Sequence, residues 1–368
     1  MKKLLILLVA LMALTISACA PSDDGGEGSN ERTYELALIT DVGTIDDKSF
    51  NQGSWEGLKE YAEDNDITYK YYAPAEKDTQ QYINSITLAV EAGAKVVVTP
   101  GYLFEPAIFQ AQDLFPEVNF VLLDGSPNDG DFDNGPVYRI EDNVYSIFYA
   151  EEQAGFLAGY AAVYEGFRSL GFMGGMAVPA VVRFGYGFVQ GAEYAAAELE
   201  EEVTIQYTYL GDFGPSPAHQ TRAAAWYDSG VEVIFAAAGG AGNSVMAAAE
   251  ATEAGKVIGV DVDQSAESET VITSAVKGLG ASVYLALEDY YAGNFKGGVE
   301  DVLDVTVDGV GLPSDFSRFE NFTQADYDEI YAALVADTDG VRTSIVKDTD
   351  VTSASEIETE FVTVTVTE

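Results

Sequence analysis

The sequence predicts an α/β protein made of two doubly wound lobes that face each other across a ligand cleft. From Tyr34 onward, short runs rich in β-branched and aromatic residues alternate with helical patterns, as in parallel α/β units. Two such series of similar length follow one another, which predicts two parallel sheets. The length of 368 residues also favours more than one domain. Ligands of such folds bind outside the carboxyl ends of the strands, where loops from both lobes converge.

The first series contains four predicted strands, and its first helix is expected near residues 50–65. Ser49 can cap this helix, and Gln52 three residues later completes a capping box. Trp55 and Leu58 follow at helical spacing, which predicts that they face the core. The strands are YELALIT, ITYKYYA, KVVVTPG and NFVLLDG, and the other helices lie near residues 78–93 and 103–115.

The second series begins after VYRIEDNVYS, and its strands are LGFMGG, TIQYTYL, VEVIFAAAGG and KVIGVDVD. Its helices are expected near residues 146–165, 179–201, 216–229 and 240–254. A run VITSAVKG, a helix near 280–292, an extended segment and a terminal helix TQADYDEIYAALVADT follow. The last residues alternate Val and Thr, which fits an edge strand or a loose tail, and we favour the tail. The predicted boundaries are 34–143 for lobe 1, 144–276 for lobe 2, 277–345 for a return to lobe 1 with hinge crossings, and 346–368 for the tail.

The amino terminus has the features of an exported lipoprotein. MKK precedes the apolar stretch LLILLVALMALTI, which has the length of a signal peptide and is too short to span a membrane comfortably. The motif ISAC resembles a bacterial lipobox, which implies removal of residues 1–18 and lipidation of Cys19; the alternative is a plain secretory signal with a chance cysteine. A polar tether follows at residues 19–33. We therefore expect the body outside the cytoplasm, held to the membrane by a lipid anchor.

Composition argues against several classes of function. Acidic residues outnumber basic ones 61 to 18, and the formal charge of −43 disfavours binding to nucleic acid. The single histidine, His219, and the single cysteine argue against most zinc sites, disulfide frameworks and Cys–His nucleophile pairs. We expect no metal and no cofactor. The acidity itself fits either a solvated surface suited to a salty medium or an acidic face that binds a partner.

The carboxyl ends of the predicted strands share a simple chemistry, because they deliver Asp or Gly. None delivers a Ser–His pair, a histidine cluster or a phosphate loop with the G-K-[ST] ending. Such a pocket is polar, rich in acceptors and flanked by aromatic residues, which suits a neutral ligand with hydroxyl groups and a flat face. The strand-end residues are Asp41, Pro100, Gly101, Asp124, Gly239, Gly240, Asp261 and Asp263.

Several of these candidates also have a purely structural interpretation. Asp47 can interact with the positive amino terminus of the following helix. Phe50 fits the core as well as a pocket wall. Phe184 and Phe188 lie one turn apart on a single predicted helix, so at least one should pack inward. Lys277 stands out because basic residues are scarce, yet the simplest expectation for it is a surface position.

The stretch DVGTIDDKSFNQGSWEGL resembles the first signature of the basic membrane protein family of lipoproteins, the purine nucleoside receptors of nucleoside ABC transporters. The similarity continues through VVVTPG, FVLLDG, EEQAGFLAGYAA, GFMGGMAVPAVVRFGYGFVQGA, VEVIFAAAGGAGNSV, VIGVDVDQ and VITSAVKG, and so covers residues 34–290. The resemblance implies a type I periplasmic-binding-protein fold and a non-enzymatic receptor that holds a purine nucleoside between its lobes. It also implies a permease and an ATPase as partners, and we expect a monomer.

The resemblance further implies ligand-facing roles for particular residues. The choices between Phe184 and Phe188, and between Asp261 and Asp263, stay open. The implied roles are Phe50 and Phe184 stacking on the base, Asn51 and Asp124 bonding its edge, Asp261 and Lys277 with the backbone of Gly239 or Gly240 holding the ribose, and Asp41 lining the first-lobe wall.

Three other functions remain as alternatives to a nucleoside receptor. The same fold can bind a sugar or another polyol, and a sensory or adhesive receptor needs no transport partner. A hydrolase would use paired acids such as Asp41 and Asp47.

Overall fold

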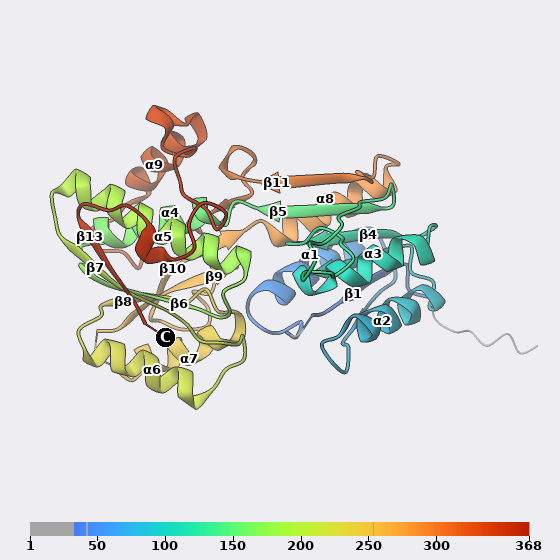
Figure 1. The fold of residues 1–368 in the computed structure, drawn as a ribbon, viewed down its shortest axis with the longest axis horizontal. Helices are drawn as coiled ribbons and strands as arrows, with labels where there is room; N and C mark the ends of the chain where they lie inside the picture. The colour runs from blue at the N-terminus through green and yellow to red at the C-terminus, as the bar shows by residue number, and fades with distance from the viewer. Residues whose placement is uncertain (1–32, 42, 253, 368) are drawn as a thin grey trace, which may run out of the picture. The chain divides into compact units, whose positions relative to one another are not determined.

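The computed structural model describes residues 33–41, 43–252 and 254–367. Two sheets with helices on both faces make up the described chain (Figure 1). The first sheet has the strand order β11-β5-β4-β3-β1-β2, and the second has the order β12-β10-β9-β8-β6-β7-β13. Every neighbouring pair is parallel except β10 and β12. The predicted doubly wound α/β architecture is therefore confirmed.

The first sheet is covered by two helices on each face, and alternate strand residues point to opposite sides. Leu36 and Leu38 pack toward α1 and α8, whereas Ala37 and Ile39 pack toward α2 and α3. Its strands are β1 (Leu36–Ile39), β2 (Tyr69–Tyr72), β3 (Val96–Pro100), β4 (Asn119–Leu123), β5 (Val144–Tyr149) and β11 (Val299–Leu303). Its helices are α1 (Phe50–Asp64), α2 (Thr79–Glu91), the short η1 (Tyr102–Phe104), α3 (Glu105–Leu114) and α8 (Leu279–Tyr291).

The second sheet has α4 and α5 on one face and α6 and α7 on the other. Phe172 and Phe235 pack toward α5, and Ile234 packs toward α6 and α7. Its strands are β6 (Ser169–Gly174), β7 (Val203–Tyr209), β8 (Val233–Phe235), β9 (Lys256–Asp261), β10 (Val271–Lys277), β12 (Val310–Gly311) and β13 (Val362–Val366). Its helices are α4 (Glu151–Glu165), α5 (Pro179–Leu199), α6 (Pro217–Asp228), η2 (Gly239–Ala241), α7 (Gly242–Glu250), η3 (Val305–Val307), α9 (Gln324–Ala336), η4 (Thr338–Gly340) and η5 (Ala354–Glu356).

The chain passes between the two sheets after β5, after β10 and after β11. Strand β5 pairs with β4, so the first lobe extends to Tyr149 and does not end at residue 143 as expected. Within 277–345 only α8 and β11 return to the first lobe, since β12 pairs with β10 and α9 packs on α4. The apolar sequence of β5 would fit a strand of either sheet. Only its pairing with β4 shows that the boundary between the lobes follows β5.

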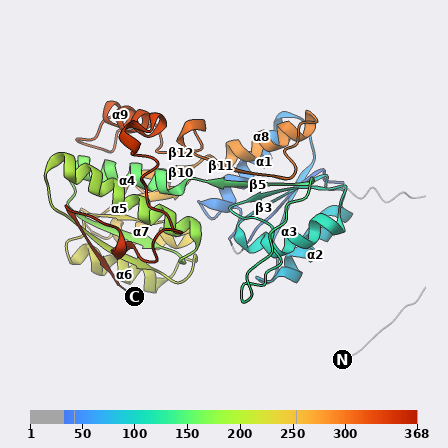
Figure 2. The ribbon, with the colours of Figure 1, turned by 45° about the horizontal axis from the view of Figure 1, so that its top comes forward.

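The carboxyl-terminal segment is ordered against the second lobe, so the expected loose tail was wrong. Strand β13 extends the second sheet by pairing with β7 (Figures 1 and 2). Glu193 of α5 accepts hydrogen bonds from the backbone nitrogens of Phe361 and Val362. Val362 is buried and Thr363 is exposed, so the Val–Thr alternation is that of an edge strand.

Helices α4 and α5 approach each other closely because glycines line their contact. A Cβ atom at Gly187 would lie 1.9 Å from the carbonyl oxygen of Glu152, and one at Gly155 would lie 2.1 Å from that of Phe184. Backbone-to-backbone contact at this distance has no room for a side chain. The packing brings the first turns of the two helices together, and these turns carry several of the charged residues described below.

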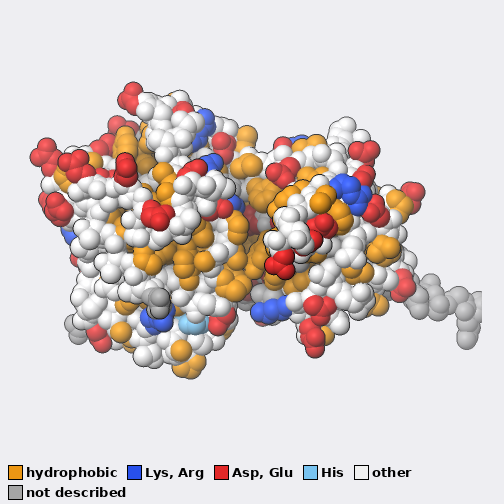
Figure 3. Space-filling view, viewed as in Figure 1, with side chains coloured by type: hydrophobic (Ala, Val, Ile, Leu, Met, Phe, Trp, Pro, Cys, Tyr) orange, Lys and Arg blue, Asp and Glu red, His pale blue; other side chains and the backbone are white. Residues whose placement is uncertain are grey.

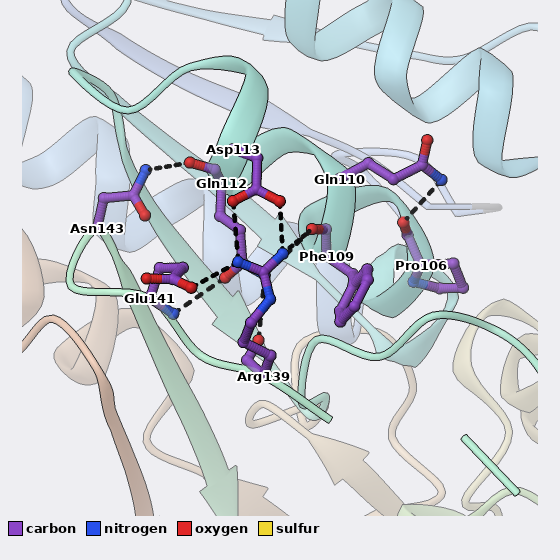
Figure 4. Close-up of polar contacts among 8 residues, drawn as sticks. All are labelled: Pro106, Phe109, Gln110, Gln112, Asp113, Arg139, Glu141 and Asn143. Atoms are coloured by element: carbon purple, nitrogen blue, oxygen red, sulfur yellow. Dashed lines mark hydrogen bonds and ion pairs between the residues drawn. The ribbon is translucent and has the colours of Figure 1, made fainter. Parts of the chain in front are cut away.

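An arginine network fixes α3 to the connection between β4 and β5 (Figure 4). Arg139 lies over the ring of Phe109 at 4.8 Å and donates to Asp113 at 2.5 Å and to Glu141 at 2.5 Å. The side chain of Gln112 donates to the Arg139 carbonyl and accepts from the Glu141 nitrogen. Arg139 is one-third exposed, so the network stabilises the outer part of the first lobe.

Candidate functional site

The amino terminus of α1 is organised by Asp47. Its carboxylate accepts hydrogen bonds from the backbone nitrogens of Ser49, Asn51 and Gln52 at 2.9, 3.1 and 3.1 Å. A carboxylate at this end of a helix also interacts favourably with the helix dipole, as we predicted. The predicted capping box was wrong. The Ser49 side chain does not cap the helix, and Gln52 accepts from the Lys48 nitrogen.

Ser49 instead joins the two lobes. Its hydroxyl donates to Asp261 Oδ2 at 2.5 Å, at the carboxyl end of β9 in the second sheet. A second hydrogen bond beside it also joins the two lobes. Gln264 Nε2 of the second lobe donates to the Lys48 carbonyl of the first lobe at 2.6 Å. The start of α1 is thus attached directly to the strand ends of the other lobe.

Asp41 and Asn51 form one wall of the site in the first lobe. Asn51 is 3% exposed, and its amide donates to Asp41 Oδ1 and to Asp47 Oδ2, both at 2.9 Å. Gly101 lies beside them with a φ of +115°, and a Cβ atom there would lie 3.3 Å from Asp41 Oδ2 and 3.7 Å from Phe50 Cε1. The glycine therefore lets the end of β3 approach Asp41 and Phe50.

The centre of the site is Lys277, at the end of β10. Its side chain is only 2% exposed, so the expected surface position was wrong. The ammonium forms a short ion pair with Asp124 Oδ2 and lies 2.8 Å from Glu151 Oε1 and 3.9 Å from Asp261 Oδ1. These carboxylates come from the end of β4, the start of α4 and the end of β9, so both lobes supply charge to one lysine.

Aromatic rings also surround the ammonium. Lys277 Nζ lies 4.9 Å from the ring centroid of Phe50, 5.4 Å from that of Phe184 and 5.3 Å from that of Tyr149. Phe50 belongs to α1 of the first lobe and Phe184 to α5 of the second. Phe188 packs on Phe235 in the second-lobe core, with ring centroids 5.3 Å apart. The structure therefore brings Phe184 to the lysine and leaves Phe188 in the core.

Of the two aspartates of VIGVDVD, one lies beside Lys277 and the other is exposed. Asp261 is buried, has a φ of +68° and faces Ser49 and Lys277. Asp263 is exposed and its carboxylate accepts from the Ser265 nitrogen. Asp124 has a φ of +51°, so both buried aspartates occupy the left-handed region that Asp tolerates better than most residues. Asp261 is thus the residue that belongs to the site.

Gly239 and Gly240 follow β8 at the same edge of the second sheet as Asp261. Gly239 has a φ of +54° and lies against Phe213, since a Cβ atom there would be 3.6 Å from that side chain. Gly240 lies beside the Phe213 carbonyl. The space beside both glycines is thus occupied by the segment around Phe213, and their role as ribose contacts remains a prediction.

Burial and charge act against each other on the carboxyl groups around Lys277. Burial raises the pKa of Asp124 to about 7, although Lys277 opposes the shift. Burial also raises the pKa of Asp261, again against Lys277. For Glu151 the raising effect of burial is outweighed by Arg183 and Lys277, which hold its pKa at about 2. Asp124 is therefore the group in this cluster most ready to accept a proton near neutral pH.

Three of the residues that build the site were not found from sequence. Glu151 contacts Lys277 and accepts from Arg183 Nε at 2.6 Å, and Ser49 bonds Asp261. Glu151 is the first residue of an acidic helix start, where a solvated carboxylate is the usual interpretation. The one available signal was Arg183, a scarce basic residue inside the apolar run PAVVRFGYGF.

Two surface cavities lie apart from this cluster. One of about 520 Å³ lies between α1 and α8, beside Gly53, Gly57, Gly280 and Tyr284. Another of about 270 Å³ lies between α5 and the segment 338–358. Neither is lined by a predicted ligand residue, so we place the functional site at the buried charges and aromatic rings around Lys277.

The protein-family model described as "ABC transporter substrate-binding protein PnrA-like" matches residues 34–350 of this chain. The chain belongs to this family. The nucleoside-binding protein BmpA of an ABC transporter from Lactococcus lactis subsp. cremoris (strain MG1363) is 29% identical, over 85% of this chain and 91% of that protein. Basic membrane protein D of Borreliella burgdorferi (strain JD1) is 31% identical, over 87% and 88%. The resemblance seen in the sequence is confirmed.

A solved structure supports the fold independently of function. An ABC transporter solute-binding protein from Aeropyrum pernix K1 superposes with a TM-score of 0.66 at 23% identity, over 86% of this chain and 88% of that one. The type I periplasmic-binding-protein fold is thus confirmed. The described residues contain no helix long and apolar enough to cross a membrane, and no group of three or more His, Cys, Asp or Glu side chains placed to hold a metal ion. Cys19, the predicted lipidation site, lies outside the described residues.

Proposed function

We propose that the protein captures a purine nucleoside between its lobes and delivers it to an ABC permease on the outer side of the membrane. One observation carries the proposal: a buried lysine shared by three carboxylates is faced by an aromatic ring from each lobe. Membership of the substrate-binding family and the nucleoside-binding name of the Lactococcus relative support it. We place its amino terminus on the membrane through a lipid at Cys19, and a permease with its ATPase subunits as its partners.

The geometry suits the two halves of a nucleoside. A flat base can stack on Phe50 and Phe184, and stacking of this kind contributes about 1–3 kcal/mol per base. Ribose hydroxyls are donors, and the carboxylate of Asp261 beside Lys277 can accept from them. Asp124 Oδ1 is buried and receives no hydrogen bond within the part of the chain that the structure describes, so it is a ready acceptor for a donor on the base.

The remaining proposed contacts come from both lobes. Asn51 already uses its two amide hydrogens on Asp41 and Asp47, and its carbonyl oxygen accepts from the Asp41 nitrogen at 3.2 Å. It would meet the base edge through the second acceptor position of that oxygen. Asp41 lines the first-lobe wall. Gly239 or Gly240 would offer backbone groups to the ribose.

The charge of the cluster favours a neutral ligand. Three carboxylates surround Lys277, and Arg183 adds a second positive charge through Glu151. Full ionisation therefore leaves one negative charge in excess. A nucleotide phosphate would add further negative charge to a buried site that lacks a cluster of arginines, which is unfavourable.

We propose binding and not catalysis as the task of these residues. The hydrolase alternative needs two available acids at Asp41 and Asp47. Asp47 is engaged by three backbone nitrogens of α1, and Asp41 Oδ1 accepts from Gly43 and Asn51. Both carboxylates are therefore hydrogen-bonded to groups at or beside the start of α1, which disfavours a catalytic role.

Isothermal titration of the purified protein with inosine, guanosine and adenosine tests the proposal. We expect micromolar or tighter binding of at least one nucleoside, about −8 kcal/mol or better. Inosine monophosphate should bind far more weakly, and ribose alone should lose the stacking contribution. Absence of heat with every nucleoside, or tighter binding of a sugar, would refute it. Release of free base during incubation would instead favour the hydrolase.

A further inference from the structure

A chain of ion pairs leads from the ligand site to the carboxyl-terminal segment. Glu151 Oε1 lies 2.8 Å from Lys277 Nζ, and Glu151 Oε2 accepts from Arg183 Nε at 2.6 Å. On its outer side, Arg183 Nη1 lies 3.5 Å from Asp348 Oδ1. The Glu151 side chain is fully buried, and those of Arg183 and Asp348 are 15% and 18% exposed. Positive and negative charges therefore alternate from Asp124 to Asp348.

The packing of α4 on α5 fixes the inner part of this chain. Glu151 begins α4, and Arg183 lies in the first turns of α5. The close approach at Gly155 and Gly187 holds the two helix starts together. Arg183 consequently reaches Glu151 from α5 of the second lobe.

The segment 341–350 is held beside the outer end of this series of ion pairs. Gln190 Nε2 donates to the Val346 carbonyl at 3.0 Å, and the Val346 nitrogen donates to Gln190 Oε1 at 2.7 Å. Lys347 Nζ lies 2.9 Å from Glu152 Oε1, whose side chain is 2% exposed. Figures 1 and 2 both show this part of the chain running along α5 toward β13. Asp348 is thus held in place next to Arg183.

We propose that Arg183 is a positioning residue for ligand binding: it keeps Glu151 ionised and directed at Lys277, and Asp348 of the carboxyl-terminal segment holds Arg183. The inference deepens the proposed function and rests on it. Lys277 is the residue that would contact the ribose, and its ammonium is shared by three carboxylates. Without Arg183, Glu151 would be a buried carboxylate with only Lys277 to compensate it. Proton uptake by Glu151 would then release the lysine from this partner.

Several groups that titrate or carry charge lie around Glu151, and they come from several elements. Removing the positive charge of Arg183 raises the pKa of Glu151 and of Asp124, and removing the negative charge of Asp348 lowers it. The groups are Asp124 at the end of β4, Tyr149 of β5, Glu152 of α4, Arg183 of α5, Asp261 of β9, Lys277 of β10, and Asp348 with Lys347 of the carboxyl-terminal segment.

The test measures inosine affinity of the full chain between pH 5 and 8 by isothermal titration. Arg183→Met should bind inosine at least about tenfold more weakly at pH 7. The pH below which affinity falls should rise by about one unit, because burial raises the pKa of Asp124 to about 7 and Arg183 opposes that shift. Asp348→Asn should lose less than about threefold, with the same limb of the profile moved to lower pH. Arg183→Lys should recover much of the affinity and of the pH profile. Opposite shifts are expected because the two substitutions remove opposite charges.

A double-mutant cycle tests whether Arg183 acts through Glu151. Adding Arg183→Met to Glu151→Gln should cost little more than the larger single effect, because the second change removes an interaction already lost. Arg139→Met is the matched control, since Arg139 also pairs with two carboxylates but lies in the outer part of the first lobe. It should leave inosine affinity and the pH profile unchanged.

Two results with a folded Arg183→Met protein would overturn the inference directly. One is an Arg183→Met protein with wild-type affinity and pH profile. The other is equal loss in Arg183→Met and Arg139→Met with no shift in pH, which indicates a structural role only. If Arg183→Met does not fold, an unchanged pH profile in Asp348→Asn refutes the proposal. If the wild-type protein binds no nucleoside, the proposed function fails, and the pH of acid unfolding in Arg183→Met then decides whether Arg183 keeps Glu151 ionised: a wild-type midpoint refutes it.

Discussion

Replacing Lys277 by methionine removes the one charge that three buried carboxylates share. The Lys277 side chain is 2% exposed, and those of Asp124, Glu151 and Asp261 are 9%, 0% and 10% exposed, so solvent screens these interactions weakly. Removing one partner of a buried ion pair costs about 3–5 kcal/mol, because the other charge stays buried without compensation. We expect Lys277→Met to lower the free energy of unfolding by an amount in this range at pH 8.

The loss should depend on pH in a definite direction. Burial already raises the pKa of Asp124 to about 7 and raises that of Asp261, and removing the ammonium raises both further. A carboxyl group whose pKa is higher in the folded state binds more protons there, so its effect on stability becomes less favourable as pH rises from about 4 through the folded pKa. The deficit of Lys277→Met relative to wild type should therefore be clearly smaller at pH 5 than at pH 8.

Urea unfolding followed by circular dichroism and intrinsic fluorescence, at both pH values and constant salt, measures this deficit. Lys296→Met is the control, because Lys296 pairs with Asp301 at 3.1 Å but is 47% exposed. An exposed pair contributes about 0–1 kcal/mol, so the control should change little at either pH. The reasoning is refuted if Lys277→Met costs no more than the control, or if its deficit is the same at pH 5 and pH 8.

Three further predictions concern the ligand, the helix packing and the acidity. Phe50→Ala should weaken inosine binding by about 1–3 kcal/mol and ribose binding much less; equal losses would favour a polyol ligand. Gly187→Ala should lower the free energy of unfolding by about 1–3 kcal/mol, because its Cβ would meet the Glu152 carbonyl at 1.9 Å. Gly214→Ala is the control and should be tolerated, because the nearest atom to its Cβ would be 3.6 Å away. Similar unfolding free energies for the two variants would contradict the packing argument. Raising NaCl from 0.1 to 1 M shortens the Debye length from about 10 to 3 Å and should raise the free energy of unfolding; a flat salt dependence would contradict self-repulsion among the acidic residues.

The acidic residues are spread over the surface in the view of Figure 3, where acidic side chains are scattered among polar and apolar ones. The composition of 61 acidic and 18 basic residues makes such a surface repel itself at low ionic strength. A dispersed distribution on this face fits the solvated surface that we weighed against a single acidic docking face. The salt prediction above tests the same interpretation.

Local patterns were sufficient for most of the fold. Alternation of β-rich and helical runs predicted the two parallel sheets, and residues such as Leu58 lie in the core as helical spacing required. The pattern failed where a choice depends on a distant partner. Strand β5 fits either sheet until β4 is placed beside it, and β13 needs the exposed edge of β7. Neither partner is visible in the local sequence.

The site shows the same limit more sharply. Asp41, Asp124 and Asp261 were found because parallel sheets bring strand ends together. Ser49 looked like a helix cap, but its hydroxyl bonds Asp261, which is 212 residues away, and Asp47 caps the helix. A capping motif states which groups are available locally and says nothing of a stronger acceptor from another element. Such an acceptor decides the role of the serine.

The division of charge between the lobes gives the cluster a mechanical consequence. Asp124 belongs to the first lobe, whereas Lys277, Asp261 and Glu151 belong to the second lobe or begin the helix that enters it. The ion pair between Asp124 and Lys277 and the hydrogen bond between Ser49 and Asp261 therefore form across the lobe boundary. A ligand that accepts or donates at these atoms competes with the contacts that join the lobes, and it must replace their hydrogen bonds to be held. A neutral ligand with a stacking face and several hydroxyls can do so without adding negative charge to a site in which three carboxyl groups face one lysine. This requirement supports the proposed nucleoside over a nucleotide.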